Sequence, residues 1–588
     1  MGGHDAIVSS LPGACREKAR LRTECGKFPT CSKHNTTSSS APDFVSTMSR
    51  AYHARLGLEH CTERKQGQGR SAIEGTDRHH RGRRRQSARR RRWCDVEVSL
   101  SRTCLRARRM AGWASWAGSV LAAAALLWYV TLWYVCCIGR SVAKRYFREP
   151  WPRSPLASGS QGETETEVPG VSILRPLAGL DCHLYANLCS SFEQQYPRDR
   201  YEVILSVRSE SDQALGVARQ VVARYPHIQS QILVGDADAG VNPKINNLVR
   251  PYALAKHDIV WVVDSQVSLG PQAMARAVDA LTMAPTRPLP LWLRREPHSK
   301  RVGLVHHVPL GVLPADTWAS HVERVFLSTT HAKMYLAINA VAVDSCVMGK
   351  SNMYRKSDLE QVPDSFFHLD RHGDRFGSRA FDDAPSDQDD VVCHGARALA
   401  RFGIYLAEDN MLALSLWRPP QQLAHRVAPG DVAHVAVGDI QTMTEYAKRR
   451  MRWIRVRRHM VPAATYVEPF TESLVAGLCG WFGLRVWLLA PLGASGSLWL
   501  LFVVFYGLHL AAWYWVDTDV HLSLRQGVPL PAAEQQRFFG AWCLREALAL
   551  PIWAWAMAGA TVTWRGQRYR ILEDAQAAPA EGGAPLAD

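Results

Sequence analysis

The chain of 588 residues has no paired-cysteine motif, no internal repeat and no apolar leader directly after Met1. Its 14 cysteines are scattered and form no CxxC pair, which argues against a zinc-binding module and against a disulfide-rich secreted domain. The part of the chain with catalytic features holds few of these cysteines, so we expect it to lie in a reducing, cytosol-facing environment. The missing apolar run after Met1 argues against a signal peptide there.

The residues that are present indicate a large, basic membrane protein. The length corresponds to roughly three or four domain-sized pieces. The formal net charge is +16, and the 20 tryptophans cluster near long apolar runs. Such clustering is typical of side chains that anchor a protein at the membrane–water interface.

Residues 1–109 form a polar extension with a dense arginine run between positions 81 and 92. One interpretation is a nucleic-acid or nuclear-targeting patch, and another is a solvated, disordered tail. The disordered tail is favoured because the segment has no sustained periodicity, and no nucleic-acid partner is expected. A third interpretation is that the mature protein begins at Met110, which directly precedes an apolar run.

The first apolar run, residues 111–139, predicts a transmembrane helix, because it exceeds the roughly 20 residues that span a bilayer. Basic residues follow it at once, at Arg140, Lys144, Arg145 and Arg148. Positive charge marks the cytoplasmic side of a membrane helix, so we expect the chain that follows to lie in the cytosol. We therefore divide this region into a transmembrane helix at 110–139 and a juxtamembrane linker at 140–170.

Residues 171–263 alternate short apolar runs with longer amphipathic segments. The expected strands are 171–174, 201–207, 231–234 and 259–263, and the expected helices are 181–195, 213–225 and 242–257. Strands that alternate with helices of about a dozen residues predict βαβ units and a parallel sheet. The predicted fold class is α/β with a mainly parallel, Rossmann-like sheet, flanked by transmembrane helices.

Charged residues follow the expected strands where the chain leaves the sheet. Right-handed crossovers bring such positions to one edge, so we expect Glu210, Asp212, Lys244 and Asp264 to line one crevice. The alternative for Asp264 is a strand-end residue that caps the next helix. Lys244 either assists phosphate binding or orders the Asn-rich turn around it.

Two later segments add acids and guanidinium groups. Glu408 and Asp409 begin a predicted helix, where the plain alternative to catalysis is favourable charge at a helix N-terminus. A predicted helix at 446–460 carries many arginines and Trp453. Guanidinium groups match diphosphate oxygens well, although arginines are also typical of the cytoplasmic flank of membrane helices.

Several motifs, taken in order, resemble the membrane-bound ceramide glucosyltransferases, an inverting nucleotide-sugar glycosyltransferase family with the GT-A fold. They are PGVSILRPLAGLD (169–181), GVNPKINNL (240–248), WVVDS (261–265), LAED (406–409), RRMRW (449–453) and WRGQRYR (564–570). Each motif is weak alone, but their order and spacing together are specific. The resemblance implies a cytosolic GT-A domain at 171–455 with insertions near 285–300 and 362–395.

The family pattern has three Asp positions and an (R/Q)xxRW box. By resemblance, the second and third Asp fall on Asp264 and Asp409, and the box falls on Arg449, Arg452 and Trp453.

The first family Asp corresponds to Ser209, so Glu210 or Asp212 would contact the nucleotide base instead. Asp264 is followed by Ser265 rather than by a DxD continuation, so it would hold Mg²⁺ or Mn²⁺ together with the donor diphosphate.

The resemblance implies transfer of glucose from UDP-glucose to the primary hydroxyl of ceramide, with inversion, to give β-glucosylceramide. Asp409 is the expected general base. Arg449 and Arg452, with the divalent cation at Asp264, would stabilise the departing diphosphate. The implied setting is a multi-pass protein of the Golgi or ER membrane with its catalytic domain in the cytosol.

Residues 456–570 predict an interfacial helix and two to three transmembrane helices, from apolar runs at 473–492, 497–516 and 538–564. Arg545 and Glu546 interrupt the last run and are expected to pair with each other. A disordered tail is expected at 571–588. The acidic insertion near 362–395 is expected to be a disordered loop, with metal binding as the alternative.

Three histidines, His306, His307 and His331, either line an acceptor path or are ordinary packed residues. Two other functions compete with the glucosyltransferase. A processive polysaccharide synthase shares the fold and the box, but few membrane helices follow the catalytic region to conduct a polymer. A non-catalytic lipid-binding scaffold is supported only by the altered first acidic segment.

Overall fold

The computed structural model describes residues 116–158, 168–282, 300–367, 396–491, 497–564, 567–572 and 575–580. The extension at 1–109, Met110 and most of both predicted insertions lie outside the described residues. The predictions made for those segments therefore stay predictions.

An eight-stranded sheet with strand order β3-β2-β1-β4-β7-β6-β8-β5 is the centre of residues 171–455, the expected catalytic domain, which we call the catalytic part. Its strands are β1 (Val171–Leu177), β2 (Tyr201–Val207), β3 (Gln229–Val234), β4 (Ile259–Val263), β5 (Val267–Ser268), β6 (Val302–Val312), β7 (Ser351–Arg355) and β8 (Ala424–Ala436). Strands β3, β2, β1 and β4 are mutually parallel, and β6 is parallel to β8. Strand β7 lies antiparallel between β4 and β6. The predicted α/β class is confirmed.

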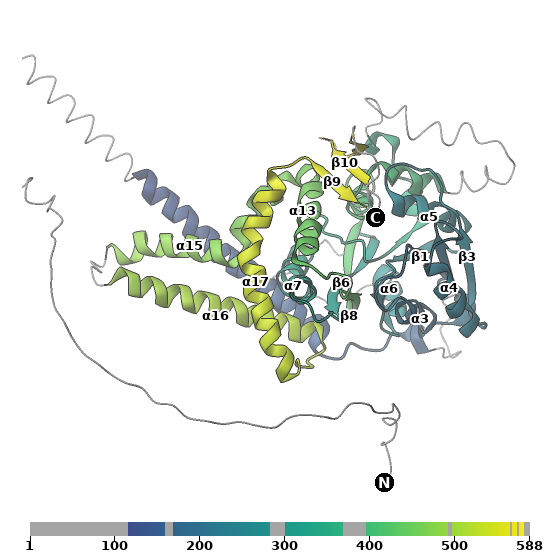
Figure 1. Cartoon of the computed structure of the whole chain (residues 1–588), viewed down its shortest axis with the longest axis horizontal. Helices are drawn as coiled ribbons and strands as arrows, with labels where there is room; N and C mark the ends of the chain where they lie inside the picture. The colour runs from purple at the N-terminus through teal and green to yellow at the C-terminus, as the bar shows by residue number, and fades with distance from the viewer. Residues whose placement is uncertain are drawn as a thin grey trace, which may run out of the picture. The chain divides into compact units, whose positions relative to one another are not determined.

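Helices cover both faces of this sheet (Figure 1). They are α3 (Leu184–Phe192), α4 (Ala214–Arg224), α5 (Pro243–Leu254), α6 (Ala273–Thr282), α7 (Trp318–Phe326), α8 (Ala332–Val341), α9 (Lys356–Glu360), α12 (Glu408–Trp417) and α13 (Met443–Met460). Because both faces are covered, β1, β2 and β4 are buried along their whole length rather than at alternate residues.

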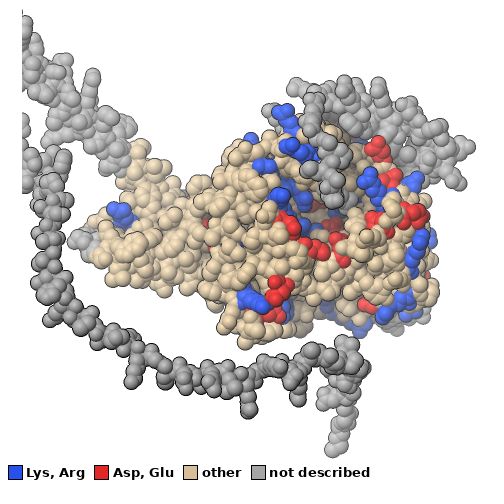
Figure 2. Space-filling model, viewed as in Figure 1, with Lys and Arg blue, Asp and Glu red and all other residues tan. Residues whose placement is uncertain are grey.

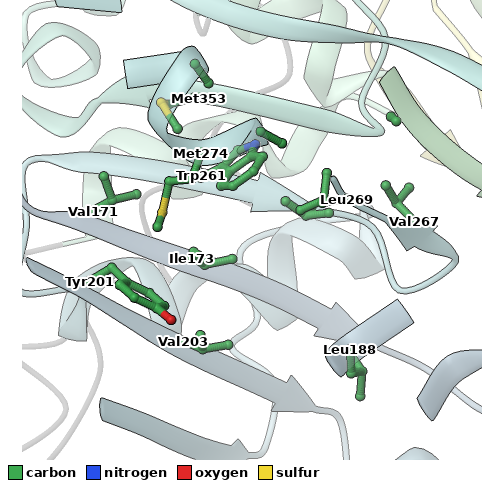
Figure 3. Close-up of a cluster of buried hydrophobic side chains, with 14 of the residues drawn as sticks. Val171, Ile173, Leu188, Tyr201, Val203, Trp261, Val267, Leu269, Met274 and Met353 are labelled. Carbon is green, nitrogen blue, oxygen red and sulfur yellow. The ribbon is translucent and has the colours of Figure 1, made fainter. Parts of the chain in front are cut away.

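Strand β4 shows this double coverage most clearly. All five of its residues are buried. Trp261 packs among Val171, Ile173 and Met353 on one face (Figure 3), and its indole N–H donates to Ser351 Oγ at 2.9 Å. Full burial of one such side chain contributes roughly 2 kcal/mol, so this core fixes the position of the residue that follows the strand.

Strand β1 is longer than the predicted 171–174, because it also includes Arg175, Pro176 and Leu177. The Arg175 guanidinium is fully buried and donates to the backbone oxygens of Ser265 and Val267, at 3.3 and 3.0 Å. From the sequence, a charged Arg175 suggests that the buried strand has ended. In the structure, the two carbonyls accept hydrogen bonds from its guanidinium group, so the side chain can be buried inside the sheet.

Two helices among the described residues are long and apolar enough to cross a membrane, Trp116–Arg148 and α16 (Leu498–Leu524). A bent pair, Pro462–Thr471 followed by Ser473–Leu489, would add a third span if it is one crossing. The second member of this pair contains α15 (Ser473–Leu484). The surface over α15 and α16 shows very few charged side chains, whereas charges gather over the catalytic part (Figure 2).

The first helix extends to Arg148, nine residues past the predicted end at 139. The basic residues expected in a linker therefore lie on its last turns. Arg140 and Arg148 pair with Asp519 of α16, at 2.6 and 2.5 Å. These ion pairs allow the helix to continue through a basic stretch.

The predicted apolar run at 538–564 is not one helix. Helix α17 (Ala532–Met557) ends seven residues earlier, and β9 (Thr561–Trp564) begins a three-stranded sheet with β10 (Gln567–Ile571) and β11 (Ala577–Pro579). Strand β11 lies within the tail that was predicted to be disordered. Its antiparallel pairing with β10 orders that segment.

Candidate active site

Asp264 follows β4 and lies between two lysines. Lys244 Nζ is 2.8 Å from Asp264 Oδ1, and Lys350 Nζ is 2.7 Å from Asp264 Oδ2. Lys350 directly precedes β7, whose residue Ser351 is the antiparallel partner of Val263. This register sets Lys350 opposite Asp264, whose backbone N–H donates to the Lys350 carbonyl at 3.1 Å.

Lys244 connects Asp264 to the acids at the start of α12. Its ammonium group is also 3.0 Å from Glu408 Oε1 and donates to the Gly349 carbonyl at 3.0 Å. The side chains of Lys244, Asp264 and Glu408 are each less than one-fifth exposed. The predicted meeting of Lys244 with Asp264 is therefore present, and Glu408 joins them.

Asp409 is held by backbone groups. Its Oδ2 accepts the Gly349 N–H at 2.5 Å, and its Oδ1 accepts the Asn410 N–H at 2.8 Å. A Cβ at Gly349 would lie 2.8 Å from Asp409 Oδ2 and 2.9 Å from Asp409 Cβ. Only glycine lets this segment approach the carboxylate so closely.

Helix α5 is aligned with α12 by its N-cap, Asn242. Its side-chain oxygen accepts from the Lys244 N–H at 2.8 Å, and its amide nitrogen donates to Glu408 Oε2 at 2.9 Å. Nearby, the backbones at Gly240 and Gly403 are so close that a Cβ on either would clash. The motif at 240–248 is thus fixed against the segment that leads to Asp409.

The charges around Asp264 and Asp409 shift their pKa values in opposite directions. Burial disfavours ionisation of Asp264, but Lys244 and Lys350 outweigh it and hold the pKa of Asp264 below its ordinary range. Burial and the neighbouring Glu408 raise the pKa of Asp409 to about 6. One acid is thus kept charged while the other is poised to accept a proton near neutral pH.

The first acidic segment is divided between two environments. Asp212 accepts hydrogen bonds from the Gly179 N–H at 3.0 Å and the Ala214 N–H at 2.9 Å, so it joins the loop after β1 to the start of α4. Glu210 is exposed and pairs with Arg219 at 3.2 Å. Asp212 therefore connects two loops at the edge of the sheet, whereas Glu210 pairs with Arg219 on the surface.

The residues of the predicted box point in different directions from α13. Arg449 Nε donates to the buried carboxylate of Glu323 at 3.0 Å. Trp453 packs against Phe326, with ring centroids 6.3 Å apart. Arg452 lies 5.9 Å from the ring of Trp564, near the C-terminal sheet. The pKa of Lys350 is lowered, mainly by burial and in smaller part by the positive charge of Arg449. Arg449 is therefore close enough to act electrostatically on the lysine that pairs with Asp264.

Sequence reasoning missed Lys350, Gly349 and Asp181. Ser265 Oγ donates to Asp181, which burial holds at a raised pKa. Asp181 does lie within a quoted motif. Lys350 and Gly349 carry no local signal, because they reach the site only through the pairing of β7 with β4.

The three histidines belong to the packed interior or its edge. His306 and His307 are fully buried on β6, where His307 Nδ1 is 2.9 Å from Ser351 Oγ. His331 stacks on Tyr335, with ring centroids 5.5 Å apart. These contacts fit the interpretation of ordinary packed residues better than that of an open acceptor path.

Curated relatives match most of the chain. A ceramide glucosyltransferase of Komagataella phaffii is 34% identical over 496 residues, which cover 78% of this chain and 91% of that protein. A ceramide glucosyltransferase of Candida albicans is 29% identical and covers 76% of this chain and 96% of its own length. Ceramide glucosyltransferase 1 of Caenorhabditis elegans is 28% identical, with 70% and 73% covered.

Solved glycosyltransferase structures are more distant. A mannosyltransferase from Pyrobaculum calidifontis in complex with GDP-Man and Mn²⁺ is 16% identical, covers 69% of this chain and 98% of that chain, and has a TM-score of 0.33. Glucosyl-3-phosphoglycerate synthase from Mycobacterium tuberculosis with Mg²⁺ and UDP is 13% identical, covers 45% and 71%, and has a TM-score of 0.24.

The family comparison covers well over half of the chain. The model described as "Glycosyl transferase family 21" matches residues 126–363 and 395–577. Its two matched ranges are separated by 364–394, where the sequence analysis predicts an insertion. With the acids and lysines of the site inside the matched ranges, the chain belongs to glycosyl transferase family 21.

Proposed function

We propose that this protein is an enzyme that transfers glucose to the primary hydroxyl of ceramide and forms glucosylceramide. The observation that carries this proposal is the 34% identity to a ceramide glucosyltransferase over 91% of that relative's length. The acids and lysines around Asp264 give the fold a site suited to such a transfer.

Asp409 serves as the general base. It takes the proton of the ceramide hydroxyl as that oxygen bonds to the anomeric carbon of glucose. The bond from the same carbon to the diphosphate oxygen breaks, and UDP leaves with the electron pair. A single displacement of this kind inverts the anomeric centre and yields a β-glucoside. A pKa of about 6 keeps Asp409 ionised at cytosolic pH and still basic enough to accept the proton.

UDP-glucose is the proposed donor, and Lys244 and Lys350 supply positive charge for its diphosphate. Both ammonium groups are buried beside Asp264. Charge that is already oriented in a water-poor site stabilises a leaving diphosphate without reorganisation. Arg449 and Arg452 add charge from α13, and Trp453 holds that helix against Phe326. Asp212 is the proposed neighbour of the nucleotide base, because it ties together the two loops at that edge.

A divalent cation fits this site through one carboxylate. Each Asp264 oxygen keeps a free lone pair after pairing with its lysine, and Mg²⁺ needs only one or two carboxylates beside substrate phosphates. Asp264 would hold Mg²⁺ or Mn²⁺ together with the donor, and the ion would neutralise charge on the diphosphate. Among the described residues no cluster of three His, Cys, Asp or Glu side chains forms a further metal site.

The proposed setting is a Golgi or ER membrane, with the catalytic part in the cytosol. Apolar helices Trp116–Arg148 and α16 support membrane insertion. Protease treatment of sealed microsomes tests the orientation. Digestion of residues 171–455 without detergent is expected, and protection of that region would contradict the cytosolic placement.

The activity is tested in membranes from a host that lacks glucosylceramide. Residues 110–588 are expressed and supplied with UDP-glucose labelled in the sugar, ceramide and Mg²⁺, beside the variant Asp409→Asn. We expect a labelled monoglucosyl lipid with the parent and a loss of about 10² to 10⁴-fold in the variant.

A labelled polymer would instead identify a polysaccharide synthase. A folded parent that yields no product would support a non-catalytic scaffold. In that case Ser209→Asp, which introduces the acid that the family has at this position, would be the first variant to test for recovery of activity.

A further inference from the structure

Helix α17 is bound to the catalytic part at its N-terminal end. Arg324 of α7 lies 2.7 Å from Glu534, and Arg537 pairs with Asp316 just before α7. The first turns of α17 are therefore held against the catalytic part by two ion pairs.

The C-terminal end of α17 is bound to the same part. Arg455 of α13 donates to the carbonyls of Trp555 and Ala556, at 3.1 and 3.0 Å, and to that of Thr561 at 2.6 Å. Arg458 donates to the Met557 carbonyl at 3.2 Å. These guanidinium groups satisfy the carbonyls that a helix leaves unpaired at its end.

A membrane-spanning helix cannot have both ends on one side. The 26 residues of α17 extend about 39 Å, more than the roughly 30 Å of a bilayer core. If α17 crossed the membrane, one of the two sets of contacts would lie on the far side. The contacts of its two ends therefore favour a helix that does not cross the membrane.

The outward face of α17 is nevertheless apolar. Its exposed positions in the middle and last turns are Phe539, Cys543, Ala547, Leu550, Pro551, Ala554 and Trp555, which we call the α17 outer face. Phe539, Leu550 and Trp555 are 50%, 45% and 44% exposed. The charged residues between them, Arg545 and Glu546, are buried and paired with each other.

The buried side of α17 is hydrogen-bonded to both α15 and α16, so the α17 outer face lies beside these apolar helices. Trp542 Nε1 of α17 donates to Asp517 Oδ2 of α16 at 2.9 Å, and Ser473 Oγ of α15 donates to Glu546 at 2.5 Å. Figure 1 shows α17 crossing α15 and α16 where these helices meet the catalytic part. A face with this position and composition is suited to lipid.

We propose that α17 lies flat in the membrane surface on the catalytic side, with the α17 outer face in lipid. Its opposite face packs on α7 and α13. Packed helix axes are about 8–10 Å apart, so α13 with its Arg449–Trp453 box lies one helix layer above the bilayer. Helix α15 then leaves the catalytic side and α16 returns to it. Strands β9 to β11 stay on that side, where Gln576 pairs with Tyr405 of the catalytic part.

Cysteine labelling in sealed vesicles tests the placement of the helix ends. Gln536→Cys and Ala558→Cys, both at exposed positions, are treated with a membrane-impermeant maleimide and read by peptide mass spectrometry. Ser211→Cys, in the exposed loop after β2, reports the catalytic side. Both α17 positions are expected to react from the same side as Ser211→Cys. Reaction of the two positions from opposite sides would establish a spanning helix and overturn the proposal.

Photo-crosslinking tests what covers the α17 outer face. The full chain carries p-benzoylphenylalanine in place of Phe539 or Leu550, in phosphatidylcholine vesicles, with the same residue in place of Gln536 as the matched control. We expect phosphatidylcholine adducts at 539 and 550 and at least fivefold fewer at 536. Cross-linked dimers would assign the face to a second copy, and equal adducts at all three positions would remove the preference for lipid. Either result overturns lipid contact. Neither readout requires turnover, so failure of the proposed reaction would not affect it.

Discussion

The pKa of Asp409 is set by opposing influences from its surroundings. Burial and Glu408 favour its protonated form, whereas Lys244 and the N–H groups of Asn410 and Gly349 favour its charged form. The balance leaves its pKa at about 6, above the ordinary value for an Asp side chain. A group balanced in this way changes its charge near pH 6, where a modest change of pH alters its protonation.

The first prediction at the residue scale concerns pH. Protonated Asp409 cannot accept the hydroxyl proton, so kcat/KM should fall tenfold per pH unit below about 6 and level off above it. Lys244 has a raised pKa and stays charged throughout this range. The decline of kcat/KM at acid pH is measured from initial rates between pH 4.5 and 8, with folding checked at each pH. An acid limb centred near 4 would show that Asp409 is not the titrating base.

The second prediction concerns Gly349, whose N–H donates to Asp409 and whose carbonyl accepts from Lys244. In Gly349→Ala the new Cβ would meet Asp409, so the carboxylate must move and kcat should fall by about 10². Gly216→Ala on α4 is the matched control, because its Cβ would meet nothing within 4 Å. Equal kcat in the two folded variants would show that the position of Asp409 does not limit the reaction.

At the scale of the element, α5 and α12 are joined through one side chain. Asn242 caps α5 with its oxygen and donates its amide hydrogens to the Tyr405 carbonyl at 2.8 Å and to Glu408. An aspartate would serve as well as a cap, but it has no hydrogen to donate and would face Glu408 with a like charge. The asparagine is required because the cap must also be a donor.

The third prediction follows from this double role. Asn242→Ala removes the cap and leaves buried acceptors unpaired, which should cost about 3 kcal/mol and lower the thermal midpoint by several degrees. Asn242→Asp should be no more stable than Asn242→Ala, although it restores the cap. Thermal unfolding of the detergent-solubilised parent and variants measures the order of their stabilities. An aspartate variant as stable as the parent would mean that the bond to Glu408 contributes little.

At the scale of the whole molecule, one buried ion pair joins the catalytic part to the membrane helices. Lys333 of α8 lies 2.7 Å from Asp517 of α16, and neither side chain is exposed. Helix α8 also carries Tyr335, whose hydroxyl accepts from the Met348 N–H in the segment that precedes Gly349. The anchoring of α16 and the position of the active-site segment thus share one helix.

The fourth prediction concerns this pair. Lys333→Met leaves Asp517 buried without a partner, which should cost roughly 3–5 kcal/mol and lower the thermal midpoint by roughly 10 °C. Adding Asp517→Asn removes the stranded charge and keeps an acceptor for Trp542, so the double variant should recover most of the loss. If the double variant is less stable than Lys333→Met, the pair itself supplies stability that neutral packing cannot replace.

Much of the site follows from the order of residues along the chain. Parallel strands joined by right-handed crossovers bring their ends to one edge, so Asp264 and Lys244 could be expected to meet. Glu210 was expected there as well, but its carboxylate pairs with Arg219 on its own surface, a choice that strand order does not decide. Lys350 was missed, because it lies 86 residues after Asp264 in the chain and reaches that carboxylate only through the antiparallel pairing of β7 with β4.

The sequence by itself determined the α/β sheet, the acids at its edge and the apolar helices beside it, because strand and helix periods and apolar length are local properties of the chain. Only the tertiary structure shows which parts of the chain hold the ends of each apolar helix, and our proposal that α17 lies on the bilayer rather than across it rests on those contacts. The apolar run at 538–564 suggests a span in the sequence, although α17 is not among the described helices that are long and apolar enough to cross a membrane. A run of apolar residues does not distinguish a helix that crosses lipid from one that lies on it. The difference is set by Arg324 and Arg455, which bind the two ends of α17 from α7 and α13. Such contacts join residues about 100 to 200 positions apart, and no local pattern encodes them.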